Sequence, residues 1–364
     1  MRRSIRFLSF AALLSLSCGS ALADHDTPSS MLGYWMQYQS RMHILQPTQK
    51  PRELTATANR ELAADLAKLA ERIVDDALAV VVIDGGELMV ETYANGASRD
   101  TRMNTYSMTK SMTALAVGEA LCAGKIASLD DKAVKYVPAL EGTAYGAASI
   151  RHLLSYTSGA QDPGGNGHVG IHSMADFRAM TTHQTSLLDL VRKYGEQQFA
   201  AGSKFVYNGL DSETLSLVLR AATGKSLPHW FEETVWQKAG AEHSAGWYLD
   251  KEGNGIGEIL FLATTRDLAR IGLYVLDRLA GNTADACVNQ FIKDAARPHI
   301  NKGYWEPAPR FGLGLHVGSD GLTWIFGHGG QRMAINTVKR RVVATNGYKD
   351  WRDTSDKVKS LASY

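Results

Sequence analysis

Cysteine is rare in this chain, which has only three among its 364 residues. None of the three lies near histidines at the spacing of metal ligands, so the sequence predicts neither a metal site nor a cofactor. Beyond the first 23 residues no apolar run is long enough to cross a bilayer, since even residues 77–83 have only the length of a strand. A sustained basic patch is also missing, because Lys339-Arg340-Arg341 is more simply a hairpin turn with solvated charges. These absences argue against nucleic-acid binding and against a membrane-spanning segment in the chain after residue 23.

The first 23 residues are typical of a secretory signal. Arginines occupy positions 2, 3 and 6, an apolar run covers residues 7–16, and small residues end at Ala21-Leu22-Ala23. We therefore predict a signal peptide over residues 1–23, cleaved after Ala23, and a periplasmic or secreted protein. A lipoprotein anchored at Cys18 is the less favoured alternative, because serine stands where a lipobox requires leucine.

Removal of this segment changes both the charge and the cysteine count. The formal net charge is +2, and the first 23 residues hold three arginines and no acid, so the remaining chain has a charge of about −1. Two cysteines remain, Cys122 and Cys287. They can pair in an oxidising compartment, but free buried thiols are equally consistent with the sequence.

The hydrophobic pattern predicts strands near both ends of the chain and helices between them. Leu62, Leu66, Leu69 and Ile73 lie on one helical face. Residues 79–84 and 87–93, joined by Gly85-Gly86, are typical of a β-hairpin. Later strands are predicted at residues 312–317, 323–326, 332–336 and 342–346. Helices are predicted from Asp211-Ser212 to Gly224, over residues 265–279 with Gly281 as the stop, and over residues 354–362.

This order implies an α/β (α+β) fold. We expect an antiparallel sheet of five or slightly more strands, built from both termini and flanked by helices, with an inserted and mainly helical lobe. The predicted division is an N-terminal extension over residues 24–60, a sheet lobe from residues 61–110 and 290–364, and a helical lobe over residues 111–289.

Ser107-Met108-Thr109-Lys110 lies in a segment, residues 106–121, that otherwise reads as a helix. Positions three apart lie on the same helical face, so the Lys110 amine can reach the Ser107 hydroxyl and act as its base. The helix dipole would stabilise the oxyanion formed when Ser107 attacks a carbonyl. The alternative is a helix-capping serine followed by a solvated lysine.

Two further patches contain groups that such a serine needs. Tyr207, in Phe205-Val206-Tyr207-Asn208-Gly209, can relay a proton to a leaving group if an ammonium lies nearby, although a half-buried aromatic is the simpler interpretation. His328-Gly329-Gly330-Gln331 follows a predicted strand, and its glycines let the backbone approach a ligand. A β-bulge or tight turn explains the same residues. The run from His152 to Gly159 is by itself a helix end and turn.

The order and spacing of these motifs resemble the serine beta-lactamase and penicillin-binding-protein superfamily. The branch in question contains class C beta-lactamases, D-alanyl-D-alanine carboxypeptidases, esterases and 6-aminohexanoate-dimer hydrolases. Ser107-x-x-Lys110 is similar to the first family motif, Tyr207 to the tyrosine of the second, and His328-Gly329-Gly330 takes the place of Lys-Thr-Gly. Residues 152–159 and 265–270 resemble two structural signatures of the same branch. The resemblance covers about residues 75–350 and implies one catalytic domain of DD-peptidase/beta-lactamase type.

The chain departs from the beta-lactamase pattern at two motifs. The second motif usually reads Tyr-x-Asn, whereas Gly209 stands two residues after Tyr207 here and Asn208 is displaced by one. His328 replaces the lysine that helps to bind the substrate carboxylate, and it is mostly neutral at pH 7. The resemblance therefore implies an esterase or amidase rather than an efficient beta-lactamase.

The implied mechanism is acyl transfer by a serine hydrolase. Lys110, partly neutral through burial, takes the Ser107 proton, and Tyr207 protonates the leaving group of a small ester or linear amide. The backbone amides of Ser107 and Gln331 form the oxyanion hole, and His328, Gly329, Gly330 and Asn208 contact the substrate. A less favoured scheme makes His328 the base. The alternatives in function are a D-amino-acid peptidase or penicillin-binding protein, and a non-catalytic envelope binding or sensor protein of the same fold.

Overall fold

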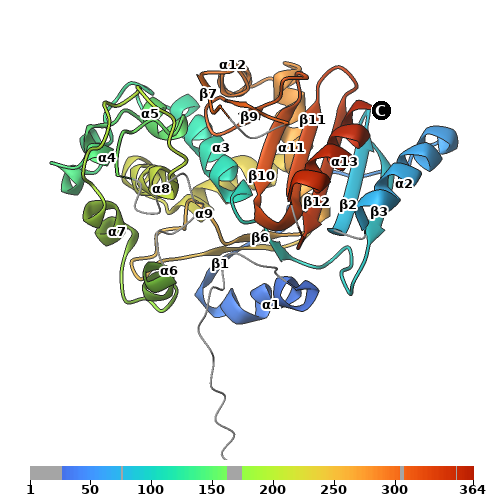
Figure 1. Ribbon diagram of the computed structural model, residues 1–364, viewed down its shortest axis with the longest axis horizontal. Helices are drawn as coiled ribbons and strands as arrows, with labels where there is room; N and C mark the ends of the chain where they lie inside the picture. Colours follow the sequence, from blue (N-terminus) through green and yellow to red (C-terminus); the bar gives the residue numbers. More distant parts are fainter. Residues whose placement is uncertain (1–26, 75–76, 162–173, 304–306, 350) are drawn as a thin grey trace, which may run out of the picture.

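The computed structural model describes residues 27–74, 77–161, 174–303, 307–349 and 351–364. Its centre is an eight-stranded antiparallel sheet in the order β3-β2-β12-β11-β10-β9-β8-β7 (Figure 1). Two strands come from the N-terminal part of the chain, β2 (Ala77–Asp84) and β3 (Glu87–Tyr93). The other six come from the C-terminal part: β7 (Ile300–Asn301), β8 (Arg310–Phe311), β9 (His316–Val317), β10 (Thr323–Gly327), β11 (Gln331–Asn336) and β12 (Arg341–Gly347). The predicted antiparallel sheet built from both ends of the chain is confirmed.

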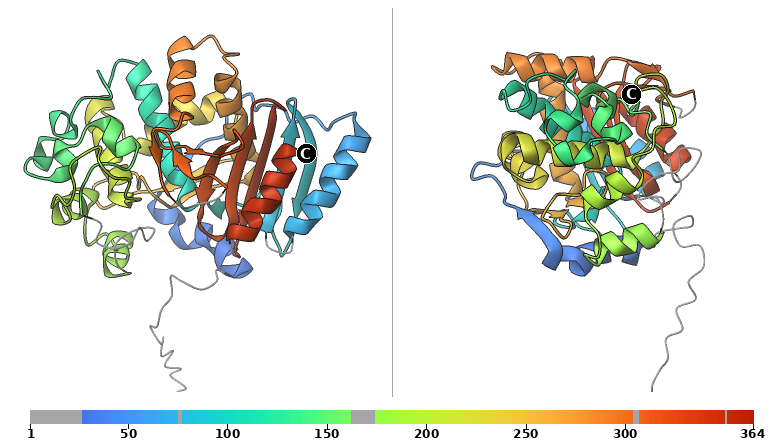
Figure 2. Two further views of the ribbon diagram at one scale, coloured as in Figure 1. Left: turned by 45° about the horizontal axis from the view of Figure 1, so that its top comes forward. Right: turned by 90° about the vertical axis from the view of Figure 1, so that its left-hand side faces the viewer.

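The central strands of this sheet send alternate residues into two different cores. Val80 and Val82 of β2 pack in the core that contains α2 (Arg60–Val74) and α13 (Trp351–Ser363). Val81 and Ile83 belong to the larger core on the opposite face. Figure 2 shows α2 and α13 together on one face of the sheet. Because β2 is buried on both faces, its sequence is a continuous apolar run without alternation.

The opposite face of the sheet is covered by α11 (Thr265–Leu279), which packs against β2, β11 and β12. Gly272 allows this close approach, because a Cβ atom there would lie 2.4 Å from Val342 Cγ1. The predicted division assigned α11 to the helical lobe, whereas in space it belongs with the sheet. The apolar face of α11 packs on the apolar strands, and this packing partner cannot be inferred from where the helix lies in the sequence.

The remaining helices form most of the second lobe, on the left of Figure 1. The predicted helix near residue 211 is α8 (Gly209–Thr223), which ends at Gly224 with a φ of +74°. Its N-cap is Asn208 and not Asp211, which lies buried in the first turn. The other helices on this side are α4 (Ala144–Ala147), α5 (Ile150–Leu154), α6 (Met174–Thr181), α7 (Leu187–Lys193) and α9 (Leu227–Phe231). Two further helices, α10 (Gln237–Ala239) and α12 (Ala286–Ala295), pack against α11.

A second, four-stranded sheet lies below the first in Figure 1, next to α1 (Pro28–Tyr38). Its strands are β1 (Met42–Leu45), β5 (Ala245–Tyr248), β6 (Phe261–Ala263) and β4 (Met103–Asn104), in that order. The sequence did not predict this sheet, because its strands have only two to four residues and β4, β5 and β6 are wholly buried. The single strand expected over residues 312–317 was wrong. Two short strands, β8 and β9, lie there instead on either side of a turn at residues 312–315, and strands of two residues leave no alternating pattern in the sequence.

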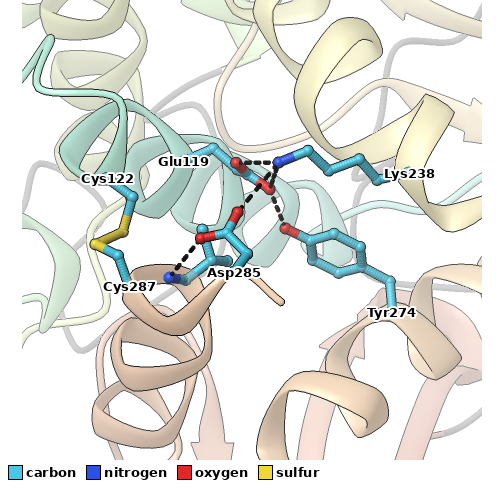
Figure 3. The surroundings of a disulfide bond; sticks show 7 residues. Glu119, Cys122, Lys238, Tyr274, Asp285 and Cys287 are labelled. Atoms are coloured by element: carbon cyan, nitrogen blue, oxygen red, sulfur yellow. Dashed lines mark hydrogen bonds and ion pairs between the residues drawn. A yellow bond between two sulfur atoms is a disulfide. The ribbon is translucent and has the colours of Figure 1, made fainter. Parts of the chain in front are cut away.

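A disulfide bond joins Cys122 at the end of α3 (Met108–Cys122) to Cys287 in α12 (Figure 3). A polar cluster around the buried Glu119 lies beside it. Lys238 Nζ donates to both Glu119 carboxylate oxygens at 2.9 and 2.7 Å, and the Tyr274 hydroxyl donates to the same carboxylate at 2.5 Å. The sequence left open whether Cys122 and Cys287 pair, and in the structure they form a disulfide.

Two sequence predictions fall outside the described residues. These are the signal peptide over residues 1–23 and the alternative anchor at Cys18. Within the residues that the structure does describe, none of the helices combines the length and the apolar character that a bilayer span requires.

Candidate active site

Ser107 lies at the start of α3, shortly after β4. It is the N-cap residue of the helix, yet its side chain makes no capping hydrogen bond. The residue before it, Tyr106, has a φ of +47°, a backbone angle that residues other than glycine rarely adopt. Strained backbone of this kind is concentrated at functional sites. Because the Ser107 hydroxyl is not used to hold the helix, the alternative of a helix-capping serine is wrong.

The backbone amides at the start of α3 are not all engaged. Those of Met108, Thr109 and Lys110 donate to the carbonyl oxygens of residues 105, 106 and 107. The Ser107 amide has no hydrogen-bond acceptor among the described residues. An amide in this position, at the positive end of a helix of 15 residues, can stabilise an oxyanion.

Lys110 reaches Ser107 from one helical turn further along. Its Nζ atom lies 3.1 Å from Ser107 Oγ, which confirms that residues three apart on this helix face one another. The two side chains are buried, with Ser107 5% and Lys110 3% exposed. A hydroxyl and an amine at this distance, shielded from water, can exchange a proton directly.

Lys110 also forms a buried ion pair with Glu258, whose Oε2 atom lies 3.1 Å from Nζ. Burial, the largest influence, lowers the pKa of Lys110, but the Glu258 carboxylate outweighs it with help from Tyr207 and Glu213. The net pKa of Lys110 is therefore raised. Our expectation of a partly neutral lysine was wrong in direction, because the sequence analysis did not identify Glu258.

Tyr207 joins this pair from a distant part of the chain, two residues before α8. Its side chain is buried, and Lys110 Nζ lies 5.2 Å from the centre of its ring. The ring packs against Tyr156 with centroids 5.1 Å apart, and against Phe205 at 6.4 Å. The structure thus brings together the three residues predicted to be catalytic, Ser107, Lys110 and Tyr207.

Asn208 was predicted to contact the substrate, and in the structure its side chain has partners within the protein. Its Oδ1 atom accepts from the Leu210 amide as the cap of α8. Its Nδ2 atom donates to Tyr145 Oη at 2.9 Å and to the Gln161 carbonyl at 3.0 Å. Both polar atoms are therefore used to hold the start of α8, and the side chain is 1% exposed.

His328, Gly329 and Gly330 form a turn between β10 and β11. The φ angles of Gly329 and Gly330 are +67° and +88°, which explains why glycine occupies both positions. His328 is exposed, and its ring packs edge-on against Tyr106 with centroids 5.6 Å apart. The turn therefore borders the segment that carries Ser107.

Gln331 follows this turn and is completely buried. Its backbone amide, the second predicted oxyanion donor, donates to the His328 carbonyl within the turn. Its side-chain amide donates to the Gly347 carbonyl at 2.7 Å and accepts from Asn346 at 2.9 Å. The backbone amide of Gln331 therefore already donates a hydrogen bond within the protein, whereas the backbone amide of Ser107 does not among the described residues.

The N-terminal extension contributes to this region, which the sequence analysis did not anticipate. Tyr34 of α1 and Tyr106 are joined by a hydrogen bond of 3.1 Å between their hydroxyl groups. Because Tyr106 precedes Ser107 and contacts His328, α1 supports one wall of the site. Across the described ranges no group of three or more histidine, cysteine, aspartate and glutamate side chains is arranged to hold a metal ion.

Known proteins with a similar sequence or fold include several hydrolases. A 6-aminohexanoate-dimer hydrolase of Paenarthrobacter ureafaciens is 26% identical over 249 residues, which is 65% of this chain and 60% of that protein. A Bacillus anthracis protein provisionally assigned as a 6-aminohexanoate-dimer hydrolase has a TM-score of 0.72 at 19% identity, over 93% of this chain and 92% of the other. A D-stereospecific amidohydrolase of a Streptomyces species has a TM-score of 0.61 at 19% identity, over 82% and 98% of the two chains.

A protein-family model described as Beta-lactamase matches residues 66–346, which is most of the chain. The matched region contains Ser107, Lys110 and Tyr207 and both lobes of the fold. The chain therefore belongs to the beta-lactamase family.

Proposed function

We propose that this protein is a serine hydrolase that forms an acyl-enzyme at Ser107 and acts on a small ester or a linear amide. The observation that carries the proposal is the 3.1 Å contact between Lys110 Nζ and Ser107 Oγ. It lies in a buried site where the hydroxyl has no capping role. A serine placed in this way next to a proton-transfer partner is the arrangement of an activated nucleophile.

The reaction proceeds in two halves. Ser107 Oγ attacks the carbonyl carbon while its proton passes to Lys110, and the resulting oxyanion rests on the Ser107 amide, with the Gln331 amide as a second donor shared with His328. Tyr207 passes a proton to the leaving alkoxide or amine. Water then attacks the acyl-enzyme, with Tyr207 or Lys110 accepting its proton.

A linear substrate is favoured over a beta-lactam. Gly209 supplies no side-chain amide, and the exposed His328 supplies no permanent positive charge for a substrate carboxylate. The names of the relatives also point to linear amides, since they include a 6-aminohexanoate-dimer hydrolase and a D-stereospecific amidohydrolase. A D-amino-acid peptidase is the alternative within the same chemistry.

Export to the periplasm or the medium is part of the proposal. Residues 1–23 have the composition of a signal peptide. The disulfide between Cys122 and Cys287 supports the same conclusion, because such bonds persist mainly in oxidising compartments.

Labelling by a fluorophosphonate or penicillin probe, read by intact mass, tests the acyl-enzyme. We expect one adduct on the wild type and none on S107A. The hydrolysis rate of S107A should fall by a factor of about 10⁴ or more. K110A should lose about 10²–10⁴-fold. S111A is the matched control, because Ser111 is a buried serine one turn further along α3 whose hydroxyl donates to the Gly314 carbonyl.

Short p-nitrophenyl esters, linear amides and D-amino-acid peptides then separate the substrate classes. Preference for the peptides would favour the peptidase alternative. Full hydrolytic activity in S107A, or no adduct on the wild type with any probe, would contradict the proposed mechanism, and the second outcome would favour a non-catalytic binder.

A further inference from the structure

The Lys110 ammonium group has one acceptor for each of its three N–H bonds. These are Ser107 Oγ at 3.1 Å, the Glu258 carbonyl oxygen at 3.3 Å and Glu258 Oε2 at 3.1 Å. An uncharged amine would instead accept the Ser107 hydroxyl proton at its lone pair and donate its two N–H bonds to Glu258, so it is the 3.1 Å contact with the Glu258 carboxylate that favours the charged form. The geometry therefore fits a lysine that holds its proton in the resting enzyme, and such a lysine needs a further group to receive the proton of Ser107.

Glu258 occupies room that exists only because residue 209 is glycine. A Cβ atom on Gly209 would lie 1.8 Å from Glu258 Oε2 and 2.5 Å from its carboxyl carbon. Any larger residue at this position would displace the carboxylate. Gly209 is the position at which the resemblance leads one to expect a side-chain amide, so the Glu258 carboxylate takes up the space left by the missing amide.

Glu258 is held in place by a second buried glutamate. The Glu213 carboxylate of α8 accepts from the backbone amides of Gly257 at 2.7 Å and Glu258 at 3.2 Å. Burial, and then the charge of Glu258, raises the pKa of Glu213 well above its usual range. Glu213 therefore keeps its proton more readily than an ordinary glutamate, and Glu258 is the carboxylate that lies against Lys110, with Oε2 3.1 Å from Nζ.

Tyrosines and one histidine also lie around the pair, together with the buried Asp211 of α8, whose charge acts on Tyr156, and Lys302 and Arg332, whose charges act on His316. Tyr207 and Tyr156 face the pair from the segment before α8 and from the end of α5, and burial followed by Tyr207 raises the pKa of Tyr156. Burial and nearby cations hold the pKa of His316 well below its usual range, so this ring is neutral. One Glu258 oxygen, Oε1, is buried and has no hydrogen-bond partner in the described part of the chain.

We propose that Glu258 is the final acceptor of the Ser107 proton, with Lys110 as the relay between them. This inference rests on the proposed function. Lys110 gives one N–H proton to the Glu258 carboxylate as the Ser107 O–H bond breaks and its proton moves to Nζ. The Oγ electron pair forms the bond to the carbonyl carbon, and the carbonyl π electrons move to its oxygen.

Charge is conserved in this step. The ion pair becomes an ammonium and a neutral carboxylic acid, and the negative charge moves from Glu258 to the substrate oxygen. When the leaving group departs, it takes a proton from Lys110 by way of Tyr207, and Lys110 takes back the proton held by Glu258. Glu258 touches no substrate atom in this scheme and acts through Lys110.

The pH dependence of fluorophosphonate labelling of Ser107 tests this proposal. In the wild type, the labelling rate should fall at low pH when the Glu258–Lys110 pair takes up a proton. We call this fall the acidic limb of the rate profile. In E258Q no carboxylate is present, so Lys110 must first lose its own proton. We expect the acidic limb of E258Q to move up by at least about one pH unit, with labelling roughly tenfold or more slower at pH 6 and recovering towards the wild-type rate above pH 9.

E119Q is the matched control. Glu119 is also a buried glutamate paired to a lysine, at 2.7 Å from Lys238, and it lies on the same helix as Lys110 but at its far end. Its loss should leave the acidic limb unchanged. An unmoved limb in E258Q, or no labelling of folded E258Q at any pH, would overturn the proposal.

A measurement on the wild type does not depend on how the variant folds. Nitrogen-15 NMR of lysine side chains should show Lys110 as an ammonium at pH 8, and a neutral amine there would overturn the proposal. A wild type that takes no label at all would instead refute the proposed acyl-enzyme. The two failures are therefore distinguishable.

Discussion

The Ser111 hydroxyl donates a hydrogen bond of 2.6 Å to the carbonyl oxygen of Gly314. This contact joins α3, which carries Lys110, to the turn between β8 and β9. The turn approaches the helix closely, because a Cβ atom on Gly314 would lie 2.1 Å from Ala114 Cβ. The position of α3 against the sheet therefore depends on glycine at residue 314.

The first prediction concerns this contact. G314A should lower the free energy of unfolding by about 2–4 kcal/mol, through overpacking against Ala114 and through the positive φ of +77°. Urea unfolding followed by tryptophan fluorescence measures the loss. G321A is the matched control, since Gly321 has a φ of +83° but nothing within 4 Å of its added Cβ atom. Equal losses in the two variants would show that the close approach to α3 has no energetic importance.

The second prediction concerns the disulfide that closes a loop of 165 residues between α3 and α12. The double variant C122S/C287S should lose about 2–5 kcal/mol of stability, because the unfolded chain regains freedom that the crosslink removes. Urea unfolding with and without a reducing agent checks this. Reduction should destabilise the wild type by a similar amount and leave the double variant unaffected. A double variant as stable as the oxidised wild type would contradict the prediction.

The third prediction is a pH dependence of stability that arises from His243. Its ring nitrogens lie 3.1 Å from Asp267 Oδ2 and 2.8 Å from Asp100 Oδ1. The hydrogen bond to Asp267 raises the pKa of His243 most strongly; burial opposes it, while the Asp267 charge and Asp100 add to it. A raised folded-state pKa means that the stabilisation is complete below the unfolded value of about 6.5 and is lost as pH rises through the folded value.

Replacement of this histidine should therefore matter most in mildly acidic solution. We expect H243N to be less stable than the wild type by on the order of 1 kcal/mol near pH 6, with the difference shrinking towards pH 9. Thermal unfolding at a series of pH values gives the comparison. H183N, which removes an exposed histidine whose ring contacts the Leu249 carbonyl and the Tyr248 ring and no carboxylate of the described residues, should show no such trend. A difference that grows with pH would mean that the sign is wrong.

Sequence reasoning succeeded where one local signal was sufficient. The β2–β3 hairpin follows from two apolar runs around Gly85-Gly86, and α11 follows from an apolar face over residues 265–279 that ends before Gly281. Ser107 and Lys110 were found because their spacing on a helix is itself the signal. These features depend on neighbours in the chain, which a sequence displays directly.

The features that were missed depend on contacts between distant residues. Glu258 lies in a short glycine-containing segment with no periodic pattern, and only its proximity to Lys110 and Gly209 gives it meaning. A signal was nevertheless present, since the missing amide at residue 209 leaves a space beside a buried ammonium that some other group must fill. Asn208 was assigned to the substrate from its position next to Tyr207, although a residue that precedes a helix is more often its cap.

The pairing of β2 with β12 has a consequence for how the molecule is made. Arg341 and Asp84 of these two strands are separated by 257 positions in the sequence and form an ion pair with a distance of 2.6 Å. The sheet can therefore close only after nearly the whole chain has been synthesised, and closing so long a loop is slow. Until then β2, which is apolar on both faces, is an open edge that can associate with other chains. Translation that stops before residue 341 should therefore yield an aggregating fragment and not a smaller folded protein.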